Sequence, residues 1–292
     1  MILENITTHQ KYEIQKTVHE NSDTGVSCYL ADDAFKKRTV FIKCMAYGSK
    51  ADPKEQEKIK SRAGNEILCL RRVNECTKGA PQLYGSWDDR KKKQIVIVME
   101  NKKGMTLREW MAQNRMEQAT PQAVKVRKEL VEQLVCIMKD ISRKYSAIVH
   151  RDLKPENIIV QVRKDGGLTP SIIDFGCANM NYMRKVGTIG YQAPEQTGDR
   201  NCSVGLSSKT DVFALGQIFY ELLLGRLPVI GTDYQKRVSD RNWVIYPVLS
   251  QLSPQLPQAE RLDRILQQMT AYRLEDRIGY DKLLSELRKV RF

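Results

Sequence analysis

Short apolar runs separated by polar turns characterise the chain up to about residue 100. β-branched and other apolar residues dominate these runs, which predicts β-strands over residues 11–47 and 81–100. The polar residues 88–93 lie between two apolar runs and predict the tip of a hairpin. Between the two groups of strands, apolar side chains recur every three or four positions over residues 54–74, which is typical of a helix with one buried face.

Beyond about residue 105, the spacing of the apolar residues becomes helical. Pro121 begins the longest of these patterns, because proline is favoured in the first helical turn. One later segment is so apolar that its helix is expected to be buried on most sides. Helices are predicted over residues 107–114, 121–141, 211–224 (the most apolar one), 262–269 and 283–290.

A strand-rich segment followed by a helix-rich one predicts an α+β fold with two lobes rather than an alternating parallel sheet. The polar, glycine-containing residues 101–104 separate the two patterns. We therefore expect residues 1–100 to form a small β-rich N-lobe with one helix. Residues 101–104 would be a hinge and residues 105–292 a larger helical C-lobe, the whole forming one domain.

The composition is that of a globular protein, with 41% hydrophobic and 28% charged residues, which excludes collagen-like and fully disordered chains. No apolar stretch is long enough to span a membrane, and the first residues lack the pattern of a signal peptide. The seven cysteines form no Cys-x-x-Cys pair, which indicates buried, reduced thiols. Together these features predict a cytoplasmic or nuclear protein.

Basic residues outnumber acidic ones by 48 to 35, and the net charge of +13 is spread over both parts of the chain. A basic surface of this kind attracts acidic partners. The charge alone leaves nucleic acid, an anionic membrane, acidic protein and phosphate open as partners. It does not indicate an oligomeric state.

The strongest chemical signal is the polar segment at residues 150–157, in which Asp152, Lys154 and Asn157 supply a carboxylate, an ammonium and an amide. Two apolar runs around a Gly-Gly turn follow, and a hairpin there would bring Asp174 beside that segment. Carboxylate and amide oxygens suit magnesium, and a lysine offsets the charge of a phosphate. Asp152 is then the carboxylate available to accept a proton from a hydroxyl.

In these residues the chain resembles the eukaryotic-type protein kinases of the Ser/Thr type. The Lys-Pro-Glu sequence that begins at Lys154 is the Ser/Thr-type form of the loop. The resemblance covers nearly the whole chain, with motifs in the order that the family has them. They are the strand lysine in 40–43, the helix glutamate in 65–70, the loop 150–157, Asp174-Phe175-Gly176, the segment 187–195, the start of a buried helix at 211–216, and Arg277 as a partner for Glu195.

The resemblance implies that ATP and Mg²⁺ are bound and that Ser/Thr hydroxyls of proteins are phosphorylated. It implies that Asp152 orients the hydroxyl and accepts its proton, that Lys154 steadies the γ-phosphate, and that Thr188 bridges these two side chains. It also implies that Asn157 and Asp174 hold the magnesium ions.

For the nucleotide, the resemblance implies that Lys43 holds the α- and β-phosphates and pairs with Glu66. It also implies that the backbone groups of Glu100 and Lys102 contact adenine. Met99 would be the gatekeeper residue at the back of the adenine site.

Two stretches depart from the family pattern. In the phosphate-covering loop, residues 20–26, only Gly25 remains of three glycines, and Glu20 and Asp23 would repel ATP if they pointed inward. The alternative is a polar turn that faces solvent. The segment 174–195 is short and has Arg184 where the family often has a phosphorylated residue, which indicates that it orders without Ser/Thr phosphorylation.

Two other functions stay open at this stage: a catalytically silent scaffold that binds partners through its basic surface, and a kinase for a lipid or sugar hydroxyl. For a protein kinase, the positive charge favours an acidic substrate. Glu156 argues against that preference, because in some members of the family it contacts a basic residue of the substrate. The cations expected at the substrate side are Lys102, Lys103, Arg184 and Lys185.

Overall fold

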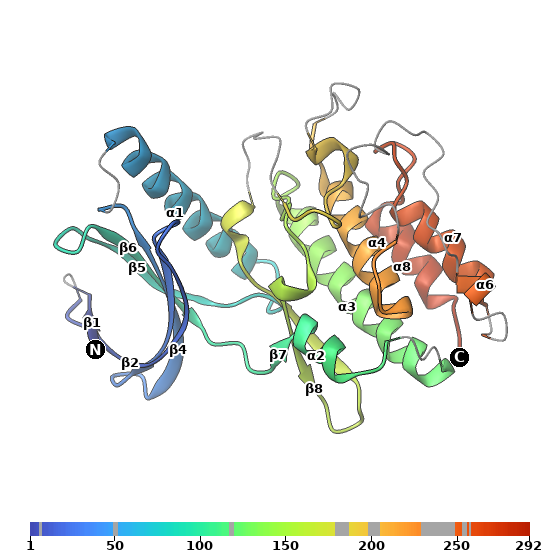
Figure 1. The fold of residues 1–292 in the computed structure, drawn as a ribbon, viewed down its shortest axis with the longest axis horizontal. Coiled ribbons are helices and arrows are strands. Elements are labelled where there is room, and N and C mark those ends of the chain that lie inside the picture. Colours follow the sequence, from blue (N-terminus) through green and yellow to red (C-terminus); the bar gives the residue numbers. More distant parts are fainter. Residues whose placement is uncertain are drawn as a thin grey trace. The chain divides into compact units, whose positions relative to one another are not determined.

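The computed structural model describes residues 1–5, 8–48, 52–116, 120–178, 187–197, 205–228, 249–252, 256 and 258–292. These residues form two compact units, residues 1–102 and 103–292, and each is described by itself (Figure 1). The N-terminal unit contains a sheet and one helix, and the C-terminal unit is mostly helical. The α+β expectation is confirmed.

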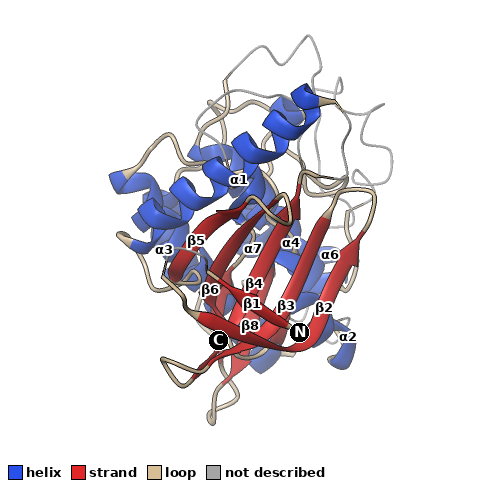
Figure 2. Ribbon diagram, turned by 90° about the vertical axis from the view of Figure 1, so that its left-hand side faces the viewer, coloured by secondary structure: helices blue, strands red, loops and turns tan. Residues whose placement is uncertain are grey.

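The N-terminal unit is built on a six-stranded antiparallel sheet with the order β1-β2-β3-β4-β6-β5, crossed on one face by helix α1 (Figure 2). Its residues 90–93 form the turn of the predicted hairpin. The short strand β1 was not predicted, because three residues are too few to show a period. The elements are β1 (Ile2–Glu4), β2 (Lys11–Asn21), β3 (Val26–Asp33), β4 (Arg38–Ala46), α1 (Pro53–Asn74), β5 (Leu83–Asp89) and β6 (Gln94–Glu100).

The side chains of β4 alternate between the hydrophobic core of this unit and the opposite face of the sheet, where Lys43 lies. Val40, Ile42 and Cys44 point into one hydrophobic cluster, and all three are buried. Because successive side chains of a strand point to opposite faces, Lys43 lies on the other face of the sheet. Helix α1 begins at Pro53 after Asp52, whose side chain accepts a hydrogen bond from the backbone N–H of Lys54.

The C-terminal unit surrounds one buried helix, α4, in which every residue from Thr210 to Leu223 is buried. This confirms the burial predicted for residues 211–224. Helices α3 and α7 pack against α4, and α8 packs against both α3 and α7. The helices are α2 (Leu107–Gln113), α3 (Pro121–Lys144), α4 (Ser208–Leu224), α6 (Leu249–Leu252), α7 (Ala259–Met269) and α8 (Tyr280–Arg288).

A three-stranded sheet of order β7-β8-β9 adjoins these helices, with β9 against α3. β8 and β9 form the hairpin that the two apolar runs predicted, and β7, which is two residues long, was not predicted. The strands are β7 (Met105–Thr106), β8 (Ile158–Val162) and β9 (Leu168–Ile172), and short 3₁₀ turns are η1 (Pro155–Asn157), η2 (Phe175–Cys177) and η3 (Pro194–Gln196).

The thiols agree with a reduced protein as far as they are described. Cys28, Cys44 and Cys69 are buried thiols, while the thiols of Cys76 and Cys136 are partly exposed. Burial raises the pKa of Cys44 to about 12, so this thiol stays protonated and unreactive at neutral pH. Among the described helices, none combines the length and the apolar character that crossing a bilayer requires.

A buried ion pair connects η3 with the segment before α8. The Arg277 guanidinium donates to both carboxylate oxygens of Glu195, at 2.7 and 3.1 Å, and both side chains are almost fully buried. Arg277 also donates to the backbone carbonyls of Lys209 and Ala271. The pair predicted between these two residues is therefore present.

Replacing Arg277 by alanine should lower the free energy of unfolding of the C-terminal unit by about 3–5 kcal/mol, because the Glu195 carboxylate would remain buried without its partner. Arg273→Ala is the matched control, since that arginine is exposed and its nearest carboxylate, on Glu275, is 4.0 Å away. This control should cost less than about 0.5 kcal/mol. Urea denaturation measures both, and equal losses would contradict the prediction.

Candidate active site

In the N-terminal unit, Lys43 of β4 and Glu66 of α1 form a buried ion pair. The ammonium of Lys43 lies 2.8 and 2.9 Å from the two carboxylate oxygens of Glu66. The side chains are 11% and 2% exposed, so solvent screens the pair little. The pairing expected from the resemblance is present.

The turn between β2 and β3 replaces a glycine-rich loop with a polar turn. The side-chain oxygen of Asn21 accepts a hydrogen bond from the N–H of Thr24, and the backbone carbonyl of Asn21 accepts one from the N–H of Gly25. Glu20 and Asp23 are exposed. Gly25 has φ +67°, and a Cβ there would lie 2.7 Å from the carbonyl oxygen of Ala46. The hairpin itself therefore requires this glycine.

Glu100 and Lys102, at the end of the N-terminal unit, pair with each other. The ammonium of Lys102 lies 2.9 Å from a carboxylate oxygen of Glu100 and also donates to the carbonyl of Lys78. The same carboxylate oxygen accepts from the N–H of Gln82. The side-chain charge of Lys102 is thus neutralised locally, which weakens its expected role as a cation for an acidic substrate. Lys103 is exposed.

In the C-terminal unit, a buried carboxylate holds the loop 150–157. Asp211 of α4 accepts from the backbone N–H groups of His150 and Arg151, at 2.8 and 2.9 Å. Burial raises the pKa of Asp211, and the nearby His150 and these two N–H donors act in the opposite direction. Arg151 has φ +69°, an unfavourable conformation for a side chain other than glycine, so these contacts hold the loop in a strained shape.

The imidazole of His150 is fully buried and orients the loop further. Its Nε2 lies 3.1 Å from the carbonyl oxygen of Ile173, which can only accept, so this nitrogen carries the proton. Nδ1 is then free to accept from the N–H of Asp152, 3.4 Å away. The ring packs edge-on against Phe175, 4.9 Å between ring centres, and so connects the loop to η2.

Asp152, Lys154 and Thr188 form one hydrogen-bonded set. The Thr188 hydroxyl donates to Oδ1 of Asp152 at 2.7 Å and accepts from the ammonium of Lys154 at 2.8 Å. Lys154 also lies 3.1 Å from the second carboxylate oxygen of Asp152. The three side chains come from two segments more than 30 residues apart, and the bridge expected of Thr188 is formed.

The segment 187–195 fits closely against the loop. A Cβ on Gly187, which has φ +120°, would lie 2.7 Å from the carbonyl oxygen of Arg151. That same oxygen accepts from the side-chain amide of Gln196 at 2.7 Å. Arg151 is therefore held at its N–H by Asp211 and at its carbonyl by Gln196, an anchor that the sequence motifs did not indicate.

Asn157 and Asp174 are brought together by the β8–β9 hairpin. The N–H of Ile173, just beyond β9, donates to the carbonyl of Asn157, and Asp174 is the next residue along the chain. The amide nitrogen of Asn157 donates to the backbone and side chain of Asp152, so its side-chain oxygen is left as an acceptor. The described residues hold no cluster of three His, Cys, Asp or Glu side chains that could bind a metal ion.

One amide oxygen and one exposed carboxylate fit Mg²⁺, which is usually held by one or two protein oxygens together with water and phosphate. The hydroxyl-bearing Tyr182 and the cations Arg184 and Lys185 lie outside the described residues. So do Cys202 and the side chain of Cys177.

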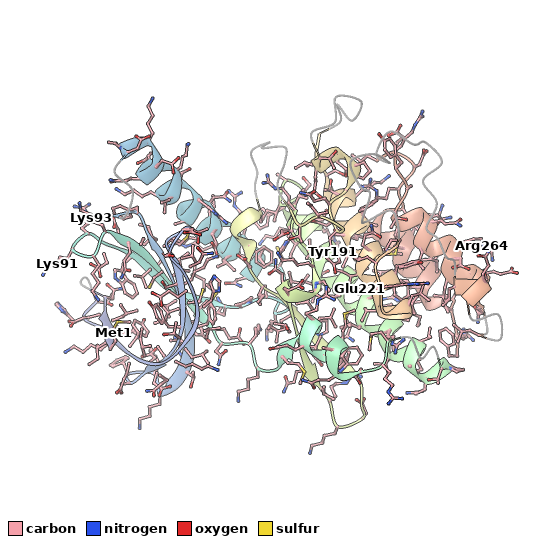
Figure 3. The ribbon with its side chains drawn as sticks, in the orientation of Figure 1. Met1, Lys91, Lys93, Tyr191, Glu221 and Arg264 are labelled. Carbon is pink, nitrogen blue, oxygen red and sulfur yellow. The ribbon has the colours of Figure 1, made fainter. Side chains whose placement is uncertain are left out.

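A further polar cluster was missed at the sequence level. Tyr191 donates from its hydroxyl to Glu221, and both residues are labelled in Figure 3. Arg108 donates to both of them. Burial and then the Glu221 carboxylate raise the pKa of Tyr191. Arg108 and Glu221 are 113 positions apart, so no local spacing could indicate the pair. The only sequence signal was Glu221, a charged residue near the end of the largely apolar residues 211–224.

Comparison with known proteins finds serine/threonine-protein kinases among the relatives of this chain. Serine/threonine-protein kinase PrkC of Bacillus subtilis is 28% identical over 275 residues, which cover 89% of this chain and 37% of PrkC. Serine/threonine-protein kinase D of Synechocystis is 27% identical over 268 residues, 84% of this chain and 48% of that protein. A probable serine/threonine-protein kinase PknB of Lactococcus lactis is 30% identical over 189 residues, 63% of this chain and 28% of that protein.

The chain thus spans less than half the length of each of these relatives. Residues 24–287 match the family model described as protein kinase domain. Because that match extends over most of both compact units, this chain belongs to the protein kinase domain family, and its α+β architecture is that family's fold.

Proposed function

We propose that this chain is a serine/threonine protein kinase, which transfers the γ-phosphoryl group of ATP to a Ser or Thr hydroxyl of a protein. The observation that carries the proposal is the hydrogen-bonded set of Asp152, Lys154 and Thr188. It holds a carboxylate and an ammonium side by side, as the proton acceptor and the phosphate partner of such a transfer must be.

In the proposed reaction, the substrate oxygen forms a bond to the γ-phosphorus and the bond to the β–γ bridging oxygen breaks, which releases ADP. The hydroxyl proton passes to Asp152, and Lys154 offsets charge on the transferred group. Asn157 and Asp174 would hold Mg²⁺, which neutralises phosphate charge when bound.

In the N-terminal unit, Lys43 is proposed to hold the α- and β-phosphates of ATP, oriented by Glu66. Gly25 and the backbone groups of Glu100 and Lys102 are proposed to contact the nucleotide. The polar turn with its single glycine supports weaker phosphate contacts than a loop with three glycines would make. A silent scaffold is not favoured, because the relatives are serine/threonine protein kinases.

Asp152→Asn should lower the rate of phosphoryl transfer by at least ~100-fold, since an amide cannot accept the proton. ATP affinity should change little. Transfer of radiolabelled phosphate to a protein substrate measures the rate. Asp140→Asn is the matched control, because Asp140 is an exposed residue of α3. Turnover of the Asp152 variant at the wild-type rate would remove the proposed role of this carboxylate.

Lys43 and Glu66 should act as one unit, so their substitutions should not add. Lys43→Met and the double variant Lys43→Met/Glu66→Gln should lose similar activity in the same assay. Lys58 and Glu55 form an exposed pair on α1, 3.2 Å apart, and serve as control through Lys58→Met/Glu55→Gln, which should keep activity. Fully multiplicative losses for the Lys43 and Glu66 substitutions would show that the two side chains work independently.

The net charge of +13 supports a preference for acidic protein substrates, exerted mainly on association. Matched acidic and basic peptides should therefore differ in kcat/KM at low ionic strength, with the acidic peptide ahead. Its advantage should shrink as salt rises, because the Debye length falls to about 10 Å at 0.1 M. A basic peptide that is preferred at both salt concentrations would contradict this, and nucleic acid would become the next partner to test.

A further inference from the structure

Arg108, at the start of α2, is held by two carboxylates from distant parts of the C-terminal unit. Its Nε donates to Glu156 of η1 at 2.8 Å, and its Nη1 donates to Glu221 of α4 at 2.6 Å. Nη2 donates to the hydroxyl of Tyr191 at 2.6 Å, and that hydroxyl donates to Glu221. We refer to Arg108, Glu156, Tyr191 and Glu221 as the Arg108 cluster.

The Arg108 cluster adjoins the proposed catalytic residues on two sides. Glu156 directly precedes Asn157, whose side-chain amide donates to the backbone carbonyl of Asp152 at 2.9 Å. On the other side, the N–H of Tyr191 donates to the carbonyl of Thr188, and the hydroxyl of Thr188 contacts Asp152. A peptide whose hydroxyl reached Asp152 would therefore have neighbouring side chains beside the cluster.

The cluster is also open to solvent. The side chains of Arg108 and Glu156 are 38% and 46% exposed, while that of Glu221 is 8% exposed. Without Arg108, two carboxylates would face an approaching peptide, and such a pair binds arginine or lysine well.

Arg108 already occupies these acceptors. Of the four carboxylate oxygens of Glu156 and Glu221, three accept from Arg108 or Tyr191. Burial lowers the pKa of the Arg108 guanidinium, but its hydrogen bonds to Glu221 and Glu156, together with electrostatic attraction to Tyr191 and Glu221, raise it overall, so the charge is retained. The buried Tyr191 hydroxyl also donates to Glu221, so this carboxylate has a second donor besides Arg108.

We propose that Arg108 is a specificity-determining residue that fills a cation site beside the catalytic aspartate, so that the kinase does not recognise arginine or lysine near the phosphorylated residue of its substrate. The inference rests on the proposed kinase function and names the substrate class that it excludes. A side chain of the same chain has a high effective concentration at this site, so a peptide arginine competes poorly with it.

The experiment measures kcat/KM for short peptides that carry one central serine or threonine among neutral residues, with ATP and Mg²⁺ present. In each further peptide, arginine replaces one neutral residue at a successive position on either side of the acceptor. The wild-type chain should gain no more than about fivefold from arginine at any position, which is the most that an exposed charge pair supplies.

Arg108→Gln should raise kcat/KM for at least one arginine peptide, relative to the neutral peptide, by about tenfold through KM, because one charge-assisted contact becomes available. Adding Glu156→Gln to this variant should remove the gain. Arg273→Gln removes the same charge at an exposed position of the same unit and should leave the ratio unchanged.

A wild-type preference for arginine above about fivefold, more than an exposed pair supplies, would overturn the proposal. So would an unchanged ratio in an Arg108→Gln variant that still phosphorylates the neutral peptide. If that variant does not fold, Glu156→Gln alone decides. Its exposed carboxylate is already paired with Arg108, so its loss should not selectively lower kcat/KM for arginine peptides, and a selective fall would overturn the proposal.

A wild-type chain that phosphorylates none of the peptides would refute the proposed function. Peptide binding would then test separately whether Arg108 fills the cation site. Calorimetric titration of the same peptides should then show equal affinities for the wild type, and about tenfold tighter binding of one arginine peptide to Arg108→Gln. Equal affinities of the arginine and neutral peptides for both proteins would overturn the inference.

Discussion

The carboxylate of Asp211 is the contact on which the catalytic loop depends. It lies inside the C-terminal unit on the buried helix α4 and accepts the backbone N–H groups of His150 and Arg151. Two donors on one carboxylate fix the direction of the chain at the entrance to the loop. They also hold Arg151 at its positive φ, which an isolated peptide would avoid. A carboxylate is costly to bury, and only satisfied donors make it tolerable. Helix α4 thus serves as core and as support for the loop at once.

From that anchor, contacts spread outward to the segment 187–195. The carbonyl of Arg151 accepts from Gln196, and Gly187 approaches the same oxygen so closely that a side chain would not fit. This close fit brings Thr188 to Asp152 and Lys154. The proposed catalytic arrangement of Asp152, Lys154 and Thr188 therefore does not depend on these three side chains alone. It results from backbone groups held at both ends by buried polar partners, which restricts motion where reacting atoms must be aligned.

The distribution of charge shows why net charge is a weak guide to local chemistry. The chain is strongly basic, yet three of the cations considered above are paired within their own units: Lys43 with Glu66, Lys102 with Glu100, and Arg108 with Glu156 and Glu221. Each pair neutralises its own surroundings, and beyond a Debye length exposed charges are screened. The positive charge acts on partners at a distance, through association. Contacts near Asp152 are decided by which carboxylates already have a partner.

The sequence by itself determined the α+β class, the main strands and helices, and the residue types at the proposed site, because these depend on local periodicity and on motifs of neighbouring residues. The strands β1 and β7 were too short to show a period. Only the tertiary structure decided that Lys102 is neutralised by Glu100, that Gly25 serves the geometry of its hairpin, and that Gln196 holds Arg151. The Arg108 cluster joins residues from α2, η1 and α4 and from the turn that contains Tyr191. These contacts depend on how α2, η1 and α4 pack. Arg108 and Glu221 are 113 positions apart, so the spacing of residues in the sequence could not indicate that they pair.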